Sequence, residues 1–188
     1  MTPFEYVSVL ISIILGLGIS QLVTGIADIV HQWERVKLYW PHMLWIGFIF
    51  FLHIQEWWTL YELRTLTSWK LHTFLFTILY PINLFILARI LFPFGTMDQG
   101  TDFKEFYFQN FRRIFVWAII SVALSITDNL LFSDLSITEQ PVQLLLFALL
   151  LFITIKNYQQ EWVHQTIAVV LSSLLLASML LREWTIGS

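Results

Sequence analysis

Apolar residues form six long stretches along the chain, and the short segments between them hold most of the charged residues. A helix needs about 20 mostly apolar residues to cross the hydrocarbon core of a bilayer. The connections are too short to form a separate soluble domain, so residues 1–188 are expected to be one transmembrane domain. The pattern predicts an all-α, polytopic membrane bundle of about six transmembrane helices, at residues 5–29, 41–61, 71–92, 113–132, 141–157 and 163–181.

The composition agrees with a lipid environment. The chain is 57% hydrophobic and only 12% charged, whereas a soluble domain is typically about 45–50% apolar and about 25% charged. So little charge cannot cover the surface of a soluble globule, and so many apolar residues exclude a disordered chain. The lipid bilayer is therefore the first expected partner. A net charge of -3 offers no basic surface for nucleic acid, and the absence of cysteine excludes thiolate metal sites.

The distribution of lysine and arginine predicts the orientation. Six spans place both termini on one side, and that side carries fewer basic residues than the other. By the positive-inside rule the richer side is cytoplasmic, so both termini are expected outside. No cleavage site follows the first apolar stretch, which is expected to remain as a span. The richer side holds Arg35, Lys37, Arg89, Lys104, Arg112, Arg113 and Lys156.

The segment before the fourth span has a helical pattern of its own. Thr101 or Asp102 can cap its start, and its aromatic residues recur on one face. One interpretation is a separate interfacial helix that leads into the span. The alternative is that the fourth span itself extends beyond the bilayer. The aromatic face would consist of Phe103, Phe106, Tyr107 and Phe111.

Small residues recur every four positions in the first span. Such a ridge lets two helix backbones approach closely, which is how helices associate in lipid. One interpretation is a close-packed helix pair inside the bundle, and the other is the seam of a homo-oligomer. The ridge consists of Ser8, Ser12, Gly16, Ser20 and Thr24.

Several polar side chains lie at membrane depth, where an ionisable group is costly and usually faces an interior. In the second span His53 and Glu56 are three residues apart, and Asp128 and Asn129 end the fourth span at a similar depth. These residues are expected to converge on one polar pocket that opens toward the side of the termini. The other spans would contribute Tyr80, Asn83 and Gln21.

Three interpretations of this pocket stay open. It can be a path for protons, ions or a small solute, with His53 titrating near neutral pH and Glu56 and Asp128 carrying charge. The same three side chains form a plausible set of metal ligands. They can also be structural, with Glu56 reaching to the interface. No hydrolase, phosphate-binding or dinucleotide motif occurs, so an enzyme is not expected, and no cofactor can be named.

Three segments in the first half of the chain resemble a family of small uncharacterised bacterial membrane proteins. They are residues 15–25, the run from Tyr39 to His42, and the run from Glu56 to Trp58. The resemblance implies a location in the bacterial inner membrane. It implies no activity, cofactor or site residue.

The sequence therefore supports two hypotheses about function. The first is a small oligomeric channel or transporter with a polar intramembrane pocket. The second is a non-catalytic membrane subunit, anchor or effector that acts with a protein partner.

Overall fold

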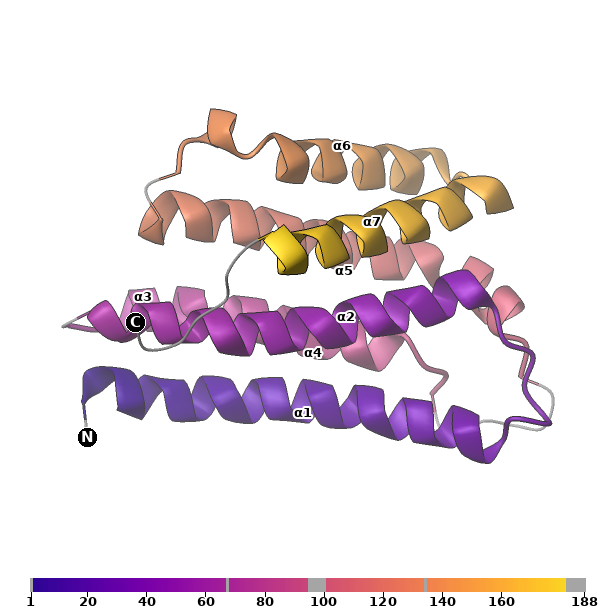
Figure 1. The fold of residues 1–188 in the computed structure, drawn as a ribbon, viewed down its shortest axis with the longest axis horizontal. Coiled ribbons are helices and arrows are strands. Elements are labelled where there is room, and N and C mark those ends of the chain that lie inside the picture. The colour runs from indigo at the N-terminus through magenta and orange to yellow at the C-terminus, as the bar shows by residue number, and fades with distance from the viewer. Residues whose placement is uncertain (1, 67, 95–100, 134, 182–188) are drawn as a thin grey trace.

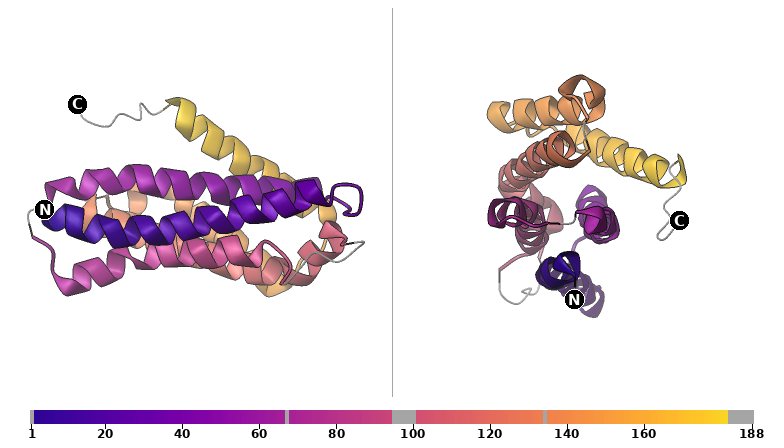
Figure 2. Two further views of the ribbon diagram at one scale, coloured as in Figure 1. Left: turned by 90° about the horizontal axis from the view of Figure 1, so that it is seen from below. Right: turned by 90° about the vertical axis from the view of Figure 1, so that its left-hand side faces the viewer.

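The computed structural model describes residues 2–66, 68–94, 101–133 and 135–181, and within these ranges the chain forms helices joined by short turns and loops (Figures 1 and 2). One isolated β-bridge, between Lys37 and Asp102, is the only β-structure in these ranges. The helices are α1 (Pro3–His31), α2 (Trp40–Thr59), η1 (Leu60–Thr65), α3 (Leu71–Thr77), α4 (Leu79–Ile90), α5 (Phe103–Phe132), η2 (Ile137–Glu139), α6 (Pro141–Lys156) and α7 (Glu161–Leu181).

Each of the six predicted spans coincides with a helix or a pair of consecutive helices. In the described part of the chain, three are both long and apolar enough to cross a bilayer: α1, the α3–α4 pair, and α5. The apolar helices near the C-terminus are shorter within the described residues. The all-helical class is thus confirmed. Helix length and composition support a membrane crossing for three of the six predicted spans.

The third span is broken where its proline predicts a kink. Pro81 has no backbone N–H, and its ring clashes with the carbonyl oxygen of Thr77, four residues earlier. The helix stops at Thr77, Ile78 forms a turn, and α4 begins at Leu79. The break leaves Thr77 and Tyr80 on adjoining turns of two separate helices.

The fourth span does not begin with a separate helix. Residues Phe103–Phe132 form one continuous α-helix, so the prediction of a separate interfacial helix is wrong, and the helix of the predicted fourth span begins at Phe103. Asp102 caps it by accepting hydrogen bonds from the backbone N–H groups of Lys104 and Glu105, at 2.9 and 3.2 Å. The segment holds no glycine or proline, and its buried face continues unbroken from Phe103 to Ser121, so nothing in the sequence interrupts the helix.

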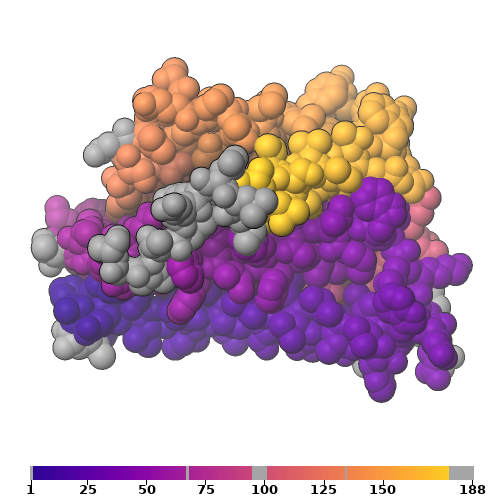
Figure 3. Space-filling view, viewed as in Figure 1, coloured from indigo at the N-terminus to yellow at the C-terminus, as the bar shows by residue number. Residues whose placement is uncertain are grey.

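Helix α4 occupies the centre of the bundle. It packs against α1, α2 and α5, while α6 packs on α5 and α7 on α2 (Figure 1). The space-filling view shows α7 along one edge of α2 and α1 along the other (Figure 3). Four side chains of α4 and the turn after it are fully buried: Leu84, Leu87, Ala88 and Leu91.

Glycines of α1 make its close contacts, but they are not those of the four-residue ridge. A Cβ on Gly18 would lie 2.1 Å from Nε2 of His53, and one on Gly25 would lie 2.4 Å from the ring of Phe92. Around Gly16 there is nothing within 4 Å. Gly16, Ser20 and Thr24 are exposed, and Ser8 and Ser12 are half-buried.

The ridge therefore does not form a helix pair within this chain, and that interpretation is wrong. The physical reason is that a four-residue step drifts by about 40° around a helix, so a strict ridge turns away from its neighbour. The buried residues of α1 alternate steps of three and four instead: Val7, Ile11, Leu15, Gly18, Leu22, Gly25 and Ile29. The seam of a homo-oligomer stays a prediction.

We expect Gly18→Ala to destabilise the protein by about 1–3 kcal/mol, because the new methyl group overlaps the His53 ring. Gly16→Ala on the same helix meets no atom and should be neutral or stabilising. Adding His53→Ala to Gly18→Ala should remove the overlap and recover part of the loss. Thermal unfolding of the purified variants measures all three effects, and equal melting temperatures for the two glycine variants would contradict this packing.

Candidate functional site

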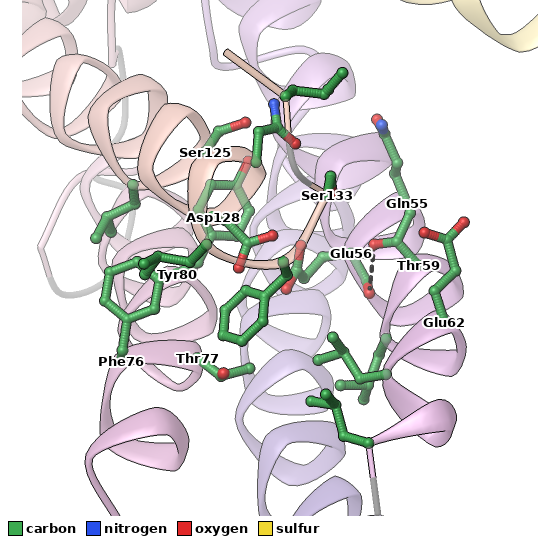
Figure 4. Close-up of a pocket in the computed structure, with 18 of the residues that line it drawn as sticks. Gln55, Glu56, Thr59, Glu62, Phe76, Thr77, Tyr80, Ser125, Asp128 and Ser133 are labelled. Carbon is green, nitrogen blue, oxygen red and sulfur yellow. Dashed lines mark hydrogen bonds between the residues drawn. The ribbon is translucent and has the colours of Figure 1, made fainter. Parts of the chain in front are cut away.

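A cavity of about 760 Å³ lies at the end of the bundle where the N-terminus is found (Figures 1 and 4). The C-terminal part of α2 forms its walls together with η1, α3, α4, the C-terminal part of α5, and one residue of α6. The polar side chains on these walls are Gln55, Glu56, Thr59, Glu62, Thr65, Thr77, Tyr80, Ser125, Asp128, Asn129, Ser133 and Gln143.

Glu56, Glu62 and Asp128 line this cavity with carboxyl groups, and two of these residues, Glu56 and Asp128, come from distant parts of the sequence. Glu56 comes from α2 and Asp128 from α5, and they are near enough to interact electrostatically with each other and with Tyr80. Figure 4 shows the three side chains around one space. None of the described residues that line the cavity is lysine, arginine or histidine. The cavity is therefore acidic and has no built-in counter-charge.

The polar groups of the cavity are poorly satisfied by the protein itself. Within the described chain, neither the Glu56 nor the Asp128 carboxylate accepts a hydrogen bond or joins an ion pair. The side-chain oxygen of Gln55 is buried and also lacks a hydrogen-bond partner among the described residues. Buried acceptors without partners are uncommon in folded proteins. This wall offers free acceptors to a bound molecule that carries positive charge or hydrogen-bond donors.

Asn129 lines the cavity, but its amide has a partner. Its Nδ2 donates to Oε1 of Gln140 at 2.9 Å, which joins the end of α5 to the residue before α6. The hydroxyl group of Thr59 donates to the backbone oxygen of Glu56 at 3.2 Å. These bonds hold the rim of the cavity and do not involve the carboxylates of Glu56 and Asp128.

His53 does not face the cavity. It is fully buried, its Nδ1 donates to the carbonyl oxygen of Ile49 at 2.8 Å, and its Nε2 lies over Gly18 of α1. Residues three apart differ by about 60° around a helix, and α2 has α1 on one side and the cavity on another. The structure thus separates His53 from Glu56.

Asn83 and Gln21 also lie outside the cavity walls. Asn83 donates from Nδ2 to the hydroxyl oxygen of Ser121 and, at 3.2 Å, to the carbonyl oxygen of Trp117, so it connects α4 to α5. Gln21 is half-buried on α1, a helix that contributes no residue to the cavity.

The described residues contain no group of three histidine, aspartate or glutamate side chains near enough together to hold a metal ion. His53 is the missing member of the predicted set, since it faces α1 instead of the two carboxylates. The metal-ligand interpretation is therefore wrong for His53, Glu56 and Asp128.

Two buried histidines at the opposite end were not expected to matter. His164 donates from Nε2 to the carbonyl oxygen of Tyr158 at 2.7 Å, so its Nδ1 accepts from the hydroxyl group of Tyr107 at 2.9 Å. His42 donates from Nε2 to the carbonyl oxygen of Leu91 at 2.8 Å. The sequence places both histidines only near span ends. The signal that could have found them is the aromatic face of α5, which supplies the rings around His164: Tyr107, Phe108, Phe111 and Phe115.

This aromatic cluster fills that end of the bundle, and two ion pairs lie on the surface beside it. Lys104 pairs with Glu161 at 2.6 Å, and Lys37 pairs with Asp102 at 3.8 Å beside the isolated bridge. Burial, and to a smaller extent the Glu161 carboxylate, raise the pKa of Tyr39 to about 12, so its hydroxyl group stays neutral. The large cavity is therefore built at one end, and packed side chains fill the other.

Comparisons with protein-family profiles, with characterised proteins and with solved structures find no match to this chain. The family resemblance of the first half stays a prediction. The function therefore has to be inferred from the geometry and chemistry of the cavity.

We expect Asn83→Ala to lower the free energy of unfolding by about 1–3 kcal/mol, because it breaks a buried link between α4 and α5. Asn110→Ala is the matched control, since Asn110 bonds only to Phe106 of its own helix and should cost less. Chemical denaturation of both variants measures the difference. Equal losses would contradict a bridging role for Asn83.

Proposed function

We propose that this chain is a membrane-embedded helical bundle. The support is its outer surface, where large apolar side chains point away from the protein along the whole of α1. Leu17, in the middle of that helix, is 53% exposed. Exposing this apolar side chain costs free energy in water but not in lipid. The other exposed apolar residues of α1 include Val9, Leu10, Ile13, Val23, Ile26 and Val30. The bacterial inner membrane and outward-facing termini belong to this proposal.

Within that bundle, the best-supported function is a small transporter that binds a positively charged solute in the acidic cavity. One observation carries this proposal: Glu56 and Asp128 face one cavity from two helices, and none of the described residues on its walls is basic. Carboxylates without a basic partner attract a cation, and the surrounding protein, which has a lower dielectric constant than water, strengthens this attraction. A solute of the size of an organic ammonium ion fits a cavity of about 760 Å³.

A transporter fits the geometry better than an open channel. The cavity lies at one end, whereas aromatic rings and ion pairs fill the other end. Passage would require the bundle to change shape so that the solute is exposed to each side in turn. The break at Ile78 is a natural hinge, because α3 can move there without distorting α4. Both Thr77 and Tyr80, on either side of this break, line the cavity.

A second candidate is a non-catalytic membrane subunit that acts with a protein partner or as a homo-oligomer. The observation that favours it is the exposure of Gly16, Ser20 and Thr24 on α1. Such a strip allows a second helix to approach closely in lipid. Flux through the purified chain separates this candidate from the first, because a subunit would need its partner.

We expect proteoliposomes containing the purified chain to take up radiolabelled tetramethylammonium. Glu56→Gln and Asp128→Asn should each reduce this uptake about tenfold or more, since each removes a carboxyl group that can ionise and pair with the bound cation. Glu105→Gln serves as the matched control, because Glu105 is exposed at the other end of the bundle.

Wild-type uptake no greater than that of empty liposomes would contradict the transporter proposal. Equal uptake by wild type and Glu56→Gln would contradict the role of the carboxylate. A stoichiometric partner captured from native membranes, together with no flux in the purified chain, would favour the second candidate.

A further inference from the structure

A second, smaller cavity of about 140 Å³ lies beside the acidic one, on the side toward the centre of the bundle. The two cavities share four lining residues, so they are neighbours with a common wall: Leu52, Tyr80, Ser125 and Gln143. The walls of the smaller cavity come from α2, α4, α5, α6 and α7.

The smaller cavity is apolar. Besides the shared residues, its walls are aliphatic or aromatic except for Ser121, whose hydroxyl group is already bonded to Asn83. Its innermost side chains are almost fully buried: Trp45, Leu87 and Leu150. Neither lysine, arginine, aspartate nor glutamate lines it among the described residues.

The change from polar to apolar follows two helices in parallel. On α2 the lining residues are Glu56, then Leu52 and Ile49, and finally Trp45, which lies about 16 Å from Glu56 along the helix axis. On α5 the order is Asp128, Ser125, Val122 and Ala118. Both helices thus present a carboxylate near the end of the bundle and apolar side chains toward its middle.

We propose that the solute is an amphipathic cation, with an ammonium head between Glu56 and Asp128 and a short apolar chain in the smaller cavity. This inference rests on the proposed function and names its substrate class. Tyr80 lies at the junction of the two cavities, where its ring can contact an ammonium group and its hydroxyl group is unbonded among the described residues. A small inorganic cation would leave the apolar cavity unused.

The chemistry of the two cavities predicts a dependence of affinity on chain length. Each methylene group buried from water strengthens binding about three- to fourfold. Affinity should therefore rise from tetramethylammonium to butyltrimethylammonium and hexyltrimethylammonium, until the smaller cavity is full. The head group alone sets the affinity for tetramethylammonium.

The experiment measures binding of these three ions to the full chain in lipid nanodiscs, with empty nanodiscs subtracted to remove partition into lipid. Val122→Phe fills the smaller cavity and should abolish the gain with chain length, measured as the ratio of hexyltrimethylammonium to tetramethylammonium affinity in the same variant. Val116→Phe is the matched control, because Val116 lies on the exposed face of the same helix and outside both cavities.

Thermal unfolding checks that Val122→Phe is folded, and Ala118→Leu, one turn away in the same cavity, provides a second test of the same effect. Equal wild-type affinity for all three ions, or an undiminished chain-length gain in a folded Val122→Phe or Ala118→Leu, would overturn this inference and leave the proposed function standing. Failure of the wild type to bind any of the three ions would overturn both.

Discussion

Polar groups inside this bundle must find partners within the protein, because its surroundings are apolar side chains and, in the proposed setting, lipid. The buried histidines meet this constraint with one ring nitrogen each, since His42, His53 and His164 all donate to a backbone carbonyl oxygen. The side-chain nitrogen of Asn83 meets it by connecting α4 to α5. The carboxylates of Glu56 and Asp128 have no such partner among the described residues and line the large cavity, which makes this cavity the place where a further molecule can bind.

The two ends of the bundle differ because the helices end differently. At one end α5 begins with aromatic residues on its buried face, and these pack around His42 and His164. At the other end α2 passes into the 3-10 helix η1, and the third span is broken before Pro81. Irregular helix ends pack less densely than continuous helices, and the large cavity lies among them. Asymmetry of this kind is what a solute carrier open to one side requires.

Periodicity and proline placement predicted much of the fold. The helical segments, the kink at Pro81 and the start of α6 at Pro141 all follow from local chemistry. The face on which α1 packs did not follow from local chemistry. Gly18 and Gly25 lie on that face because the bulky side chains of His53 and Phe92 lie opposite them, and the sequence does not show that these residues meet.

Part of the candidate site was likewise predictable. Membrane depth and polarity pointed to Glu56, Tyr80, Asp128 and Asn129, and the structure gathers these four around one cavity. Shared depth could not exclude His53, Asn83 or Gln21, since depth does not determine which neighbour a side chain faces. The smaller cavity was beyond sequence reasoning, because gaps between side chains depend on how five helices meet.

Thiol accessibility in proteoliposomes tests most directly whether a water-filled cavity opens on one side of a membrane-embedded bundle. The chain has no cysteine, so Thr59→Cys in the cavity wall and Leu17→Cys on the outer face of α1 each introduce a single reporter. A membrane-impermeant thiol reagent should modify Thr59→Cys from one side only, and Leu17→Cys from neither. Rapid modification of Leu17→Cys, or modification of Thr59→Cys from both sides or from neither, would contradict this arrangement.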